Sequence, residues 1–417
     1  MTSSSPGSAI PARQATLLVA FMWFAYFLNY GDRQVVFAMF PALKADLKLS
    51  DTHLGLTGSV FLWIYAIGCP IAGQFADRIS KRQLVVLSLV VWSVVTAATG
   101  LANSALTLLL LRAAMGVSES LYMPAAIALT AGAHPPERRS RAIAALTTAQ
   151  IAGTVAGGWF GGWMAQQGRW REAFFILGAV GLLFAAPYFA FLRGVPETQA
   201  DAPHPSGARL AVGELVRVPT FLVLCLAFPA FVFGLWLLYG WLPNFLHEKF
   251  HLDLAAAAFN ATVFLQGATL IGMLSGGVLA DVLFKQTQAA RFWLLAGSLI
   301  LCAPFLRALG GADTLAATRL AAIGFGLFSG FFMGNIFPAA FEVVPAHTRA
   351  SAVGVLNFFG AAMSGVATLL GGAWKQSVGL DRLLSVTSLV YLAAAVLVML
   401  GVRYLFPADL RRNQTSP

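Results

Sequence analysis

Residues 73–83 read GQFADRISKRQ, and a related stretch, GGVLADVLFKQ, occupies residues 276–286. Three residues recur 204 positions later: Gly73, Asp77 and Lys81 return as Gly277, Asp281 and Lys285. Further along, YMPAA followed by RRSRAIA is matched by IFPAA followed by HTRASAV. Repeats at a fixed separation indicate a duplicated structural unit. The sequence therefore predicts two halves of similar construction.

The composition around these stretches is that of a membrane protein. Of the 417 residues, 58% are hydrophobic and 11% are charged, whereas a soluble chain of this length exposes far more charge. A helix of about 20 apolar residues crosses the hydrocarbon core of a bilayer. Twelve such runs are present, at residues 15–40, 53–76, 83–101, 105–131, 141–165, 172–192, 219–243, 256–280, 292–309, 315–339, 350–373 and 383–406. We therefore predict an all-α membrane protein with twelve transmembrane helices in two six-helix, pseudo-symmetric bundles.

A polar segment divides the twelve runs into six and six. Residues 193–219 read RGVPETQADAPHPSGARLAVGELVRVP, which is rich in Pro, Gly and charge and too polar for the bilayer. We expect an N-terminal bundle at 1–192, a cytoplasmic linker at 193–218 and a C-terminal bundle at 219–417. Parallel repeats of this kind imply a central cavity between the halves.

The net charge of +10 follows the expected topology. If the N-terminus is inside, sixteen of the 27 Lys and Arg residues lie in inner segments and eight in outer segments. The positive-inside rule then places both termini in the cytoplasm, and no nucleic-acid partner is expected. The N-terminus lacks the features of a signal peptide, so the first span should remain in a multi-pass protein of the cell membrane, here a bacterial inner membrane. Because Cys69, Cys225 and Cys302 lie within spans without ligand spacing, we expect neither disulfide nor metal.

Four charged side chains lie deep in predicted spans of the first half: Asp32, Arg33, Arg112 and Glu119. A charge at bilayer depth costs about 2.5–3.5 kcal/mol on insertion scales, so such groups normally face a cavity or a partner. Arg112 offers a planar fork that suits a carboxylate. Glu119, in poorly solvated surroundings, could exchange a proton near neutrality. Seven residues separate these two, which places them on one helix face about 10 Å apart. In the alternative interpretation, the four charges only neutralise one another in ion pairs between the two helices. This structural role and a role in binding substrate and protons can coexist.

The stretch 73–83 resembles the loop motif between spans two and three of the major facilitator superfamily, with Ser80 where a second Gly is usual. Asp77 lies at the inner end of a helix, where it can pair with basic groups of neighbouring helices and hold the cytoplasmic side closed. The repeat at Asp281 favours such a gate over a solvated loop that only obeys the positive-inside rule. The predicted gate residues are Gly73, Asp77, Arg78, Lys81, Arg82, Asp281 and Lys285.

Span five contains GTVAGGWFGGW at residues 153–163. Its glycines follow a four-residue spacing at Gly153, Gly157 and Gly161, with Gly158 and Gly162 beside them. Such a stripe lets another helix backbone approach closely. It resembles the superfamily's glycine-rich motif in this span, with Gly158 in place of the usual Pro. We expect tight packing along a moving interface and no contact with substrate.

Two further stretches, NYGDR at 29–33 and RAAMGVSESLYMPA at 112–125, are similar to the anion:cation symporter family, which contains proton-coupled sugar-acid transporters. The resemblance covers essentially the whole chain. It implies that Asp32 and Glu119 carry proton coupling and that Arg33 or Arg112 meets the anion. Further positions that match the family's substrate pocket are Tyr30, Tyr65, Gln150 and Asn357, although such side chains also serve as helix contacts or core packing.

We therefore predict a secondary transporter that carries a small organic anion, a sugar acid or another carboxylate, with protons by alternating access. It should act as a monomer, without a cofactor, and not as an enzyme, since no ATP-binding loop, dinucleotide fingerprint or zinc spacing is present. Aromatic residues dominate FVFGLWLLYGWLP (231–243) and GFGLFSGFFMGNIFPAAF (324–341), which leaves room for an aromatic or less polar acid. The alternative is a spinster-like transporter of lipids or lysolipids, because that group shares the charged first span and the Arg…Glu fourth span.

Overall fold

The computed structural model describes residues 11–76, 80–134, 136–195 and 212–415, and within them the chain is helical with no β-strand. The N-terminal half contains α1 (Ala12–Ala38), α2 (Phe40–Asp46), α3 (Asp51–Ala76), α4 (Lys81–Thr99), α5 (Ala105–Ser120), α6 (Tyr122–Ala133), α7 (Pro136–Gln166) and α8 (Trp170–Leu192). The C-terminal half contains α10 (Pro219–Phe250), α11 (Leu254–Phe284), α12 (Ala290–Gly311), α13 (Leu315–Val343), η1 (Ala346–Thr348), α14 (Arg349–Ala373), α15 (Leu380–Tyr404) and α16 (Phe406–Thr415).

Ten helical segments of the described chain are long and apolar enough to cross a membrane. Two of them join neighbouring elements: α5 with α6 forms Ala105–Thr130, and η1 with α14 forms Ala346–Ala373. The remaining two predicted spans, 15–40 and 141–165, lie mainly in α1 and within α7, which have 27 and 31 residues. Every predicted span is thus helical, and the predicted all-α membrane fold is confirmed.

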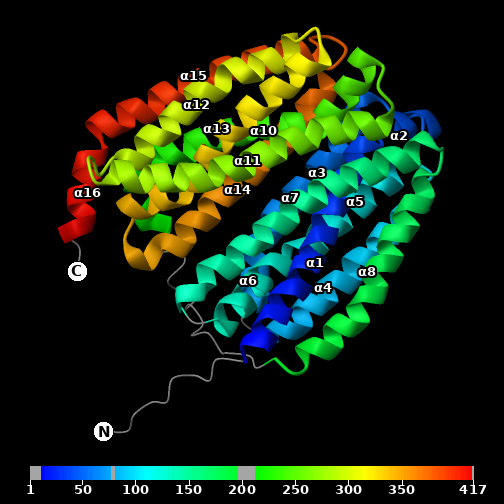
Figure 1. Cartoon of the computed structure of the whole chain (residues 1–417), viewed down its shortest axis with the longest axis horizontal. Coiled ribbons are helices and arrows are strands. Elements are labelled where there is room, and N and C mark those ends of the chain that lie inside the picture. The colour runs from blue at the N-terminus through cyan, green and yellow to red at the C-terminus, as the bar shows by residue number, and fades with distance from the viewer. Residues whose placement is uncertain (1–10, 77–79, 135, 196–211, 416–417) are drawn as a thin grey trace.

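The two halves lie side by side, and their internal packing repeats (Figure 1). In the N-terminal half α1 packs on α7, α3 on α5 and α4 on α8. In the C-terminal half the equivalent spans pack in the same pairs, α10 with α14, α11 with α13 and α12 with α15. The contacts between the halves are equivalent as well, since α3 packs on α14 and α7 packs on α11. This pairing is the pseudo-symmetry that the sequence repeat predicts. The boundary at 193–218 stays a prediction, because residues 196–211 lie outside the described residues.

The glycine stripe of α7 lies against α1. A Cβ atom at Gly157 would come within 2.5 Å of the Gly31 Cα, and one at Gly161 within 2.7 Å of the Val35 carbonyl oxygen. A Cβ at Gly153 would collide with the Phe27 carbonyl. These obstacles are mainly backbone atoms, which cannot rotate away as a side chain can. The two helices therefore approach this closely because α7 presents glycine at every fourth position.

The two neighbouring glycines of α7 contribute to the boundary between the halves. Gly162 faces the backbone of Leu254 on α11, where any Cβ would collide. A Cβ at Gly158 would lie 3.3 Å from the Gln34 side chain and 3.8 Å from Ala258 of α11. The stripe thus packs on α1 with one edge and on α11 of the other half with the other edge.

Side chains of α3 bind the backbone of α14 across the boundary between the halves. The Ser59 hydroxyl donates to the Gly365 carbonyl at 2.6 Å, and the Trp63 indole N–H donates to the Ala362 carbonyl at 2.9 Å. The Trp63 indole lies over Gly365, where a Cβ would collide with it. These two helices are therefore held together by directed hydrogen bonds as well as by apolar contact.

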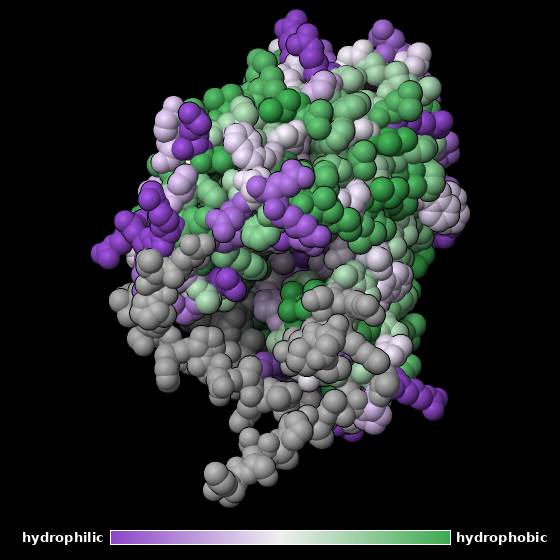
Figure 2. All heavy atoms as spheres, turned by 60° about the vertical axis from the view of Figure 1, so that its left-hand side comes forward, coloured by the Kyte–Doolittle hydropathy of each residue, from purple (hydrophilic) through white to green (hydrophobic). Residues whose placement is uncertain are grey.

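The halves meet at the end of the molecule opposite the chain termini. There a Cβ at Gly55 of α3 would lie 3.1 Å from Leu369 of α14, and Gly162 contacts Leu254 as described above. At the end that holds the termini, the surface has a recess (Figure 2). The protein is therefore closed at one end and hollowed at the other.

Candidate functional site

An ion pair lies at the centre of the N-terminal half. Arg33 Nε of α1 and Glu119 Oε2 of α5 are 2.6 Å apart, and the two residues are 5% and 0% exposed. Glu119 lies next to a break in its span, because α5 ends at Ser120 and α6 begins at Tyr122. Pro124 has no N–H to donate to the Ser120 carbonyl, which accounts for this break. The sequence thus places a carboxylate at a helix interruption and opposite a guanidinium.

Three aromatic rings surround the Arg33 guanidinium. Its Cζ lies 4.7 Å from the ring centre of Tyr30, 5.0 Å from that of Phe61 and 4.6 Å from that of Tyr65. A cation over an aromatic face gains about 0.5–2 kcal/mol, with the larger values in dry surroundings. These rings therefore stabilise the charge of Arg33 where water is largely excluded, and they bring the predicted residues Tyr30 and Tyr65 to the site.

Asp32, next to Arg33, faces a different neighbour. It is 3% exposed, and its Oδ2 accepts a hydrogen bond from the Thr96 hydroxyl of α4 at 3.2 Å. Its Oδ1 has no hydrogen-bond partner within the described part of the chain. The two charges of the NYGDR stretch therefore have different hydrogen-bond partners, although they are adjacent in sequence. Thr96 carries no sequence signal of its own, since it lies in an ordinary apolar span.

Arg112 is buried within the N-terminal half. It is 0% exposed, its Nε donates to the Thr57 carbonyl at 3.2 Å, and its Nη1 lies 3.1 Å from the Met115 sulfur. Its Cζ is 4.8 Å from the ring centre of Phe61, so both arginines contact the same ring. Of the two predicted anion ligands, Arg33 contacts three aromatic rings, whereas Arg112 contacts one ring and binds the backbone of α3 from α5.

The C-terminal half faces Arg33 with aromatic residues of α10. The Gln34 amide donates to the Tyr239 carbonyl at 3.1 Å, and the ring centres of Phe37 and Trp236 are 6.5 Å apart. Trp236 also packs against the cluster of Phe61, Leu62 and Met115. Gln34 carries no sequence signal of its own, and Trp236 and Tyr239 are indicated only by the aromatic density of residues 231–243.

The remaining predicted pocket residues lie on two other helices. Gln150 is half-buried on α7, one turn before Thr154, whose hydroxyl donates to the Gln150 carbonyl. Asn357 lies on α14 of the other half with an exposed side chain. The structure records no direct contact of either side chain with Arg33, so their part in the pocket stays a prediction.

The predicted cytoplasmic gate is described in part. Asp77 and Arg78 lie outside the described residues, and Gly73 lies in the last turn of α3. Lys81 begins α4, whose N-terminus is capped by the hydroxyl of Ser80, and Arg82 donates to the Val195 carbonyl at 2.9 Å.

In the repeat of this loop, Asp281 forms an ion pair of 2.9 Å with Arg291 in the first turn of α12. Arg291 also pairs with Glu342 near the end of α13. Lys285 is exposed at the end of α11. The repeated aspartate thus pairs with a basic group of a neighbouring helix in its own half.

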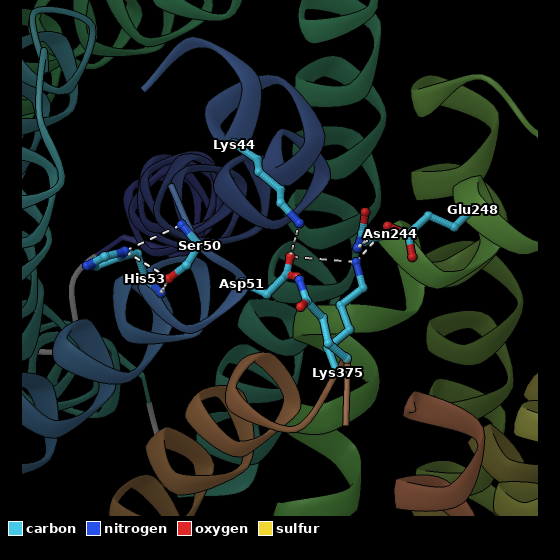
Figure 3. A network of polar contacts seen from close by, with 8 residues as sticks. Lys44, Ser50, Asp51, His53, Asn244, Glu248 and Lys375 are labelled. Atoms are coloured by element: carbon cyan, nitrogen blue, oxygen red, sulfur yellow. Dashed lines mark hydrogen bonds and ion pairs between the residues drawn. The ribbon is translucent and has the colours of Figure 1, made fainter. Parts of the chain in front are cut away.

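A second ion-pair network joins the halves at the closed end (Figure 3). Asp51 at the start of α3 lies 2.7 Å from Lys44 of its own half and 3.8 Å from Lys375 of the other half. Gln376 donates to Asp51 at 3.0 Å, and Lys375 also pairs with Glu248 at 2.6 Å. This network could not be predicted, because pairs between residues this far apart in sequence leave no local pattern.

Comparison with known proteins shows which family has this architecture. The described residues contain no group of three or more His, Cys, Asp or Glu side chains suited to a metal ion. The sequence model of the Major Facilitator Superfamily matches residues 22–368. The hexuronate transporter of Bacillus subtilis (strain 168) is 27% identical over 360 residues, which cover 84% of this chain and 85% of that protein. The probable sulfoacetate transporter of Cupriavidus necator is 30% identical over 337 residues, which cover 74% of this chain and 76% of that protein.

A solved structure shows the same fold. The crystal structure of a bacterial homolog of the human lysosomal transporter spinster, in an inward-facing and occupied conformation, matches with a TM-score of 0.81 and 21% identity, covering 96% of this chain and 99% of that chain. The superfamily model, the relatives and the duplicated six-span architecture agree with the resemblance in the sequence, and the relatives are transporters and not enzymes. The chain belongs to the major facilitator superfamily of membrane transporters.

Proposed function

We propose that this transporter carries a small organic anion across the cell membrane together with protons, by alternating access. The observation that carries this proposal is the buried pair of Arg33 and Glu119, 2.6 Å apart. It provides a fixed positive charge for a carboxylate and a titratable group in direct contact with that charge. The relatives named for hexuronate and sulfoacetate transport support an anionic substrate.

The pair offers a physical reason for coupling. Removing one member of a buried ion pair costs about 3–5 kcal/mol, because the other charge is left without compensation. When a substrate carboxylate takes the place of Glu119 on Arg33, Glu119 avoids this cost only if it is protonated. When Glu119 releases its proton, it competes for Arg33 and displaces the anion. Anion and proton therefore bind and leave together.

Asp32 is the second proposed proton site. Its carboxylate accepts a hydrogen bond from Thr96, and the free Oδ1 can hold a proton without loss of that bond. A neutral Asp32 would also reduce the negative charge in the half that must receive an anion. Arg112 keeps a positive charge beneath the site and, as the sequence resemblance implies, is a second candidate for contact with the anion.

The closed and hollowed ends support alternating access. We assign the hollowed end, which holds the termini, to the cytoplasm, so that the structure corresponds to an inward-facing state. The Asp51 network would then hold the outer side closed, and the predicted gate residues around Asp77 and Asp281 would close the inner side in the opposite state. The glycine edges of α7 let the halves move against each other while backbones remain in contact.

Transport of a lipid or lysolipid by a spinster-like mechanism is the second candidate. The aromatic residues Trp236 and Tyr239 beside Arg33 favour it, because they suit an acyl chain as well as a ring. The fold likeness to the spinster homolog is compatible with both candidates.

One experiment separates the two candidates. Full-length protein in liposomes is supplied with radiolabelled organic anions, with and without an inwardly directed proton gradient, and lysophosphatidylcholine transfer is measured in parallel. Anion uptake that rises with the gradient supports the proposal. Lysolipid transfer without anion uptake would overturn it, and gradient-independent anion uptake would remove the proton coupling.

A further inference from the structure

The C-terminal half presents aromatic residues to the stretch of α1 that follows Arg33. Trp236 and Tyr239 are half-buried on α10, with ring centres 5.7 Å apart at an interplanar angle of 70°. Trp236 lies near Phe37 of α1, and the Tyr239 carbonyl is held by Gln34, the neighbour of Arg33 in sequence. Trp236 also packs against the cluster that contains Phe61, whose ring centre lies 5.0 Å from the Arg33 Cζ, while Tyr30 and Tyr65 contact the guanidinium directly.

Several polar side chains in the C-terminal spans already bind helix backbone. The hydroxyl groups donate to backbone carbonyls one turn earlier, at Thr262, Thr269, Ser329, Ser364 and Thr368. The Asn335 amide donates to the carbonyls of Gly276 and Phe331. Among the described residues, Gln266 Nε2 on α11 is buried without a hydrogen-bond partner, and Asn357 on α14 is exposed. This half therefore offers few free partners for the hydroxyl groups of a ligand.

The balance of free energies disfavours a sugar acid in such a site. A buried polar group without a partner costs about 1–3 kcal/mol, so several unpaired hydroxyls would offset much of the binding energy of one carboxylate. A planar ring has no such groups, and each aromatic pair that it forms adds about 0.5–1.5 kcal/mol beyond the apolar area it buries. The surroundings of Arg33 therefore favour a charged head on a flat apolar body.

We propose that the substrate is a monocarboxylate whose body is an aromatic ring with at most one or two polar substituents. This inference rests on the proposed function, since it assigns the substrate class of the same site. The carboxylate binds Arg33 in place of Glu119, and the ring lies between Tyr30 and Tyr65 of one half and Trp236 and Tyr239 of the other. A ring held by both halves also gives them a common ligand around which to close.

The test is a binding panel at one pH, measured by isothermal titration calorimetry on the purified full-length protein. The probes are phenylacetate, 4-hydroxyphenylacetate, D-glucuronate, D-galactonate, the neutral phenylacetamide and lysophosphatidylcholine. We expect the two aromatic acids to bind about tenfold or more tighter than the sugar acids, and the amide to bind far more weakly than its acid.

Each other result of the binding panel would overturn a different part of the proposal. If the sugar acids bind as tightly as the aromatic acids, the substrate class is wrong while transport of an organic anion stands. If the lysolipid binds and no acid does, or if no probe binds, both the class and the proposed function fail. Equal affinity for phenylacetate and phenylacetamide would remove the carboxylate from recognition.

A set of tryptophan variants tests the ring contact itself. Trp236→Ala should weaken phenylacetate about tenfold and glucuronate little, and Trp236→Phe should restore most of the affinity because it keeps a ring. Trp293→Ala is the control, since Trp293 lies on α12 with 44% of its surface exposed. An equal loss for both acids in Trp236→Ala would indicate a purely structural role and would contradict the proposal.

Discussion

The carboxylate of Asp51 and the ammonium group of Lys375 lie 3.8 Å apart across the boundary between the two halves. Asp51 is also 2.7 Å from Lys44 of its own half, and its side chain is 5% exposed. One aspartate thus neutralises a lysine from each half. Without it the two ammonium groups would repel each other at the end where the halves are in contact.

Loss of this charge should open the closed end. Asp51→Asn keeps the size of the side chain but leaves Lys44 and Lys375 without their shared partner. A hydrogen bond to a charged group contributes about 1.5–3 kcal/mol, so the ratio of closed to open molecules should fall about tenfold or more. The measurement is the distance between spin labels at Ala45 and Asp313, two exposed positions on opposite halves at this end.

Asp46→Asn is the matched control for that measurement. Asp46 lies at the same end and pairs with Arg171 at 2.7 Å, but both belong to the N-terminal half. It should therefore leave the label distance unchanged. An equal shift in both variants would mean that surface charge, and not the contact between halves, sets the distance.

Glu119→Gln should separate uptake from exchange. The amide has nearly the shape of the acid but cannot release a proton, so it cannot compete for Arg33 as an anion. We expect uptake driven by a proton gradient to be lost, while exchange of internal for external substrate continues. Both are measured in the same liposomes with labelled substrate, and persistence of gradient-driven uptake would remove Glu119 from coupling.

The two buried arginines should fail in different ways when each is replaced by lysine. Arg33→Lys keeps the charge but loses the planar fork and its stacking on three rings, so anion affinity should fall about tenfold with thermal stability nearly unchanged. Arg112→Lys loses the contacts to Thr57 and Met115. It should lower the free energy of unfolding by about 1–3 kcal/mol, with a smaller effect on affinity. Calorimetry and thermal unfolding of both variants decide this, and a reversed pattern would make Arg112 the anion ligand.

The glycine stripe predicts a contrast between two glycine-to-alanine changes. Gly157→Ala would place a Cβ 2.5 Å from the Gly31 Cα, whereas at Gly297 of α12 a Cβ meets nothing within 4 Å. The first should destabilise the fold by about 1–3 kcal/mol, since two backbones must separate. The second should be neutral or stabilise by about 1 kcal/mol, because alanine favours the helix. Equal unfolding temperatures would show that α1 and α7 yield easily.

Much of this architecture could be predicted from the sequence because its causes are local. Span lengths, the repeat at Asp77 and Asp281, and the spacing of Gly153, Gly157 and Gly161 depend only on nearby residues. They correspond to helices, to equivalent packing in the two halves and to the contact of α7 with α1.

The site was harder to predict. The spacing of residues along a helix shows which side chains share a face, but it does not show which neighbouring residues pack against that face. The spacing placed Arg112 and Glu119 on one wall, and the structure shows Arg112 engaged with Thr57 while Glu119 contacts Arg33. Which groups Arg112 and Glu119 contact depends on the rotation of α5 within its bundle. The sequence does not contain that rotation in any short pattern.

The hydrogen bonds from Ser59 and Trp63 end on carbonyl oxygens of α14, and every amino acid supplies such an oxygen. Mutations along α14 can therefore accumulate without a compensating change on α3, provided that position 365 stays small beneath the indole. The contact requires particular side chains on α3 but only backbone on α14. We therefore expect the α14 surface to change faster in evolution than Ser59 and Trp63 of α3.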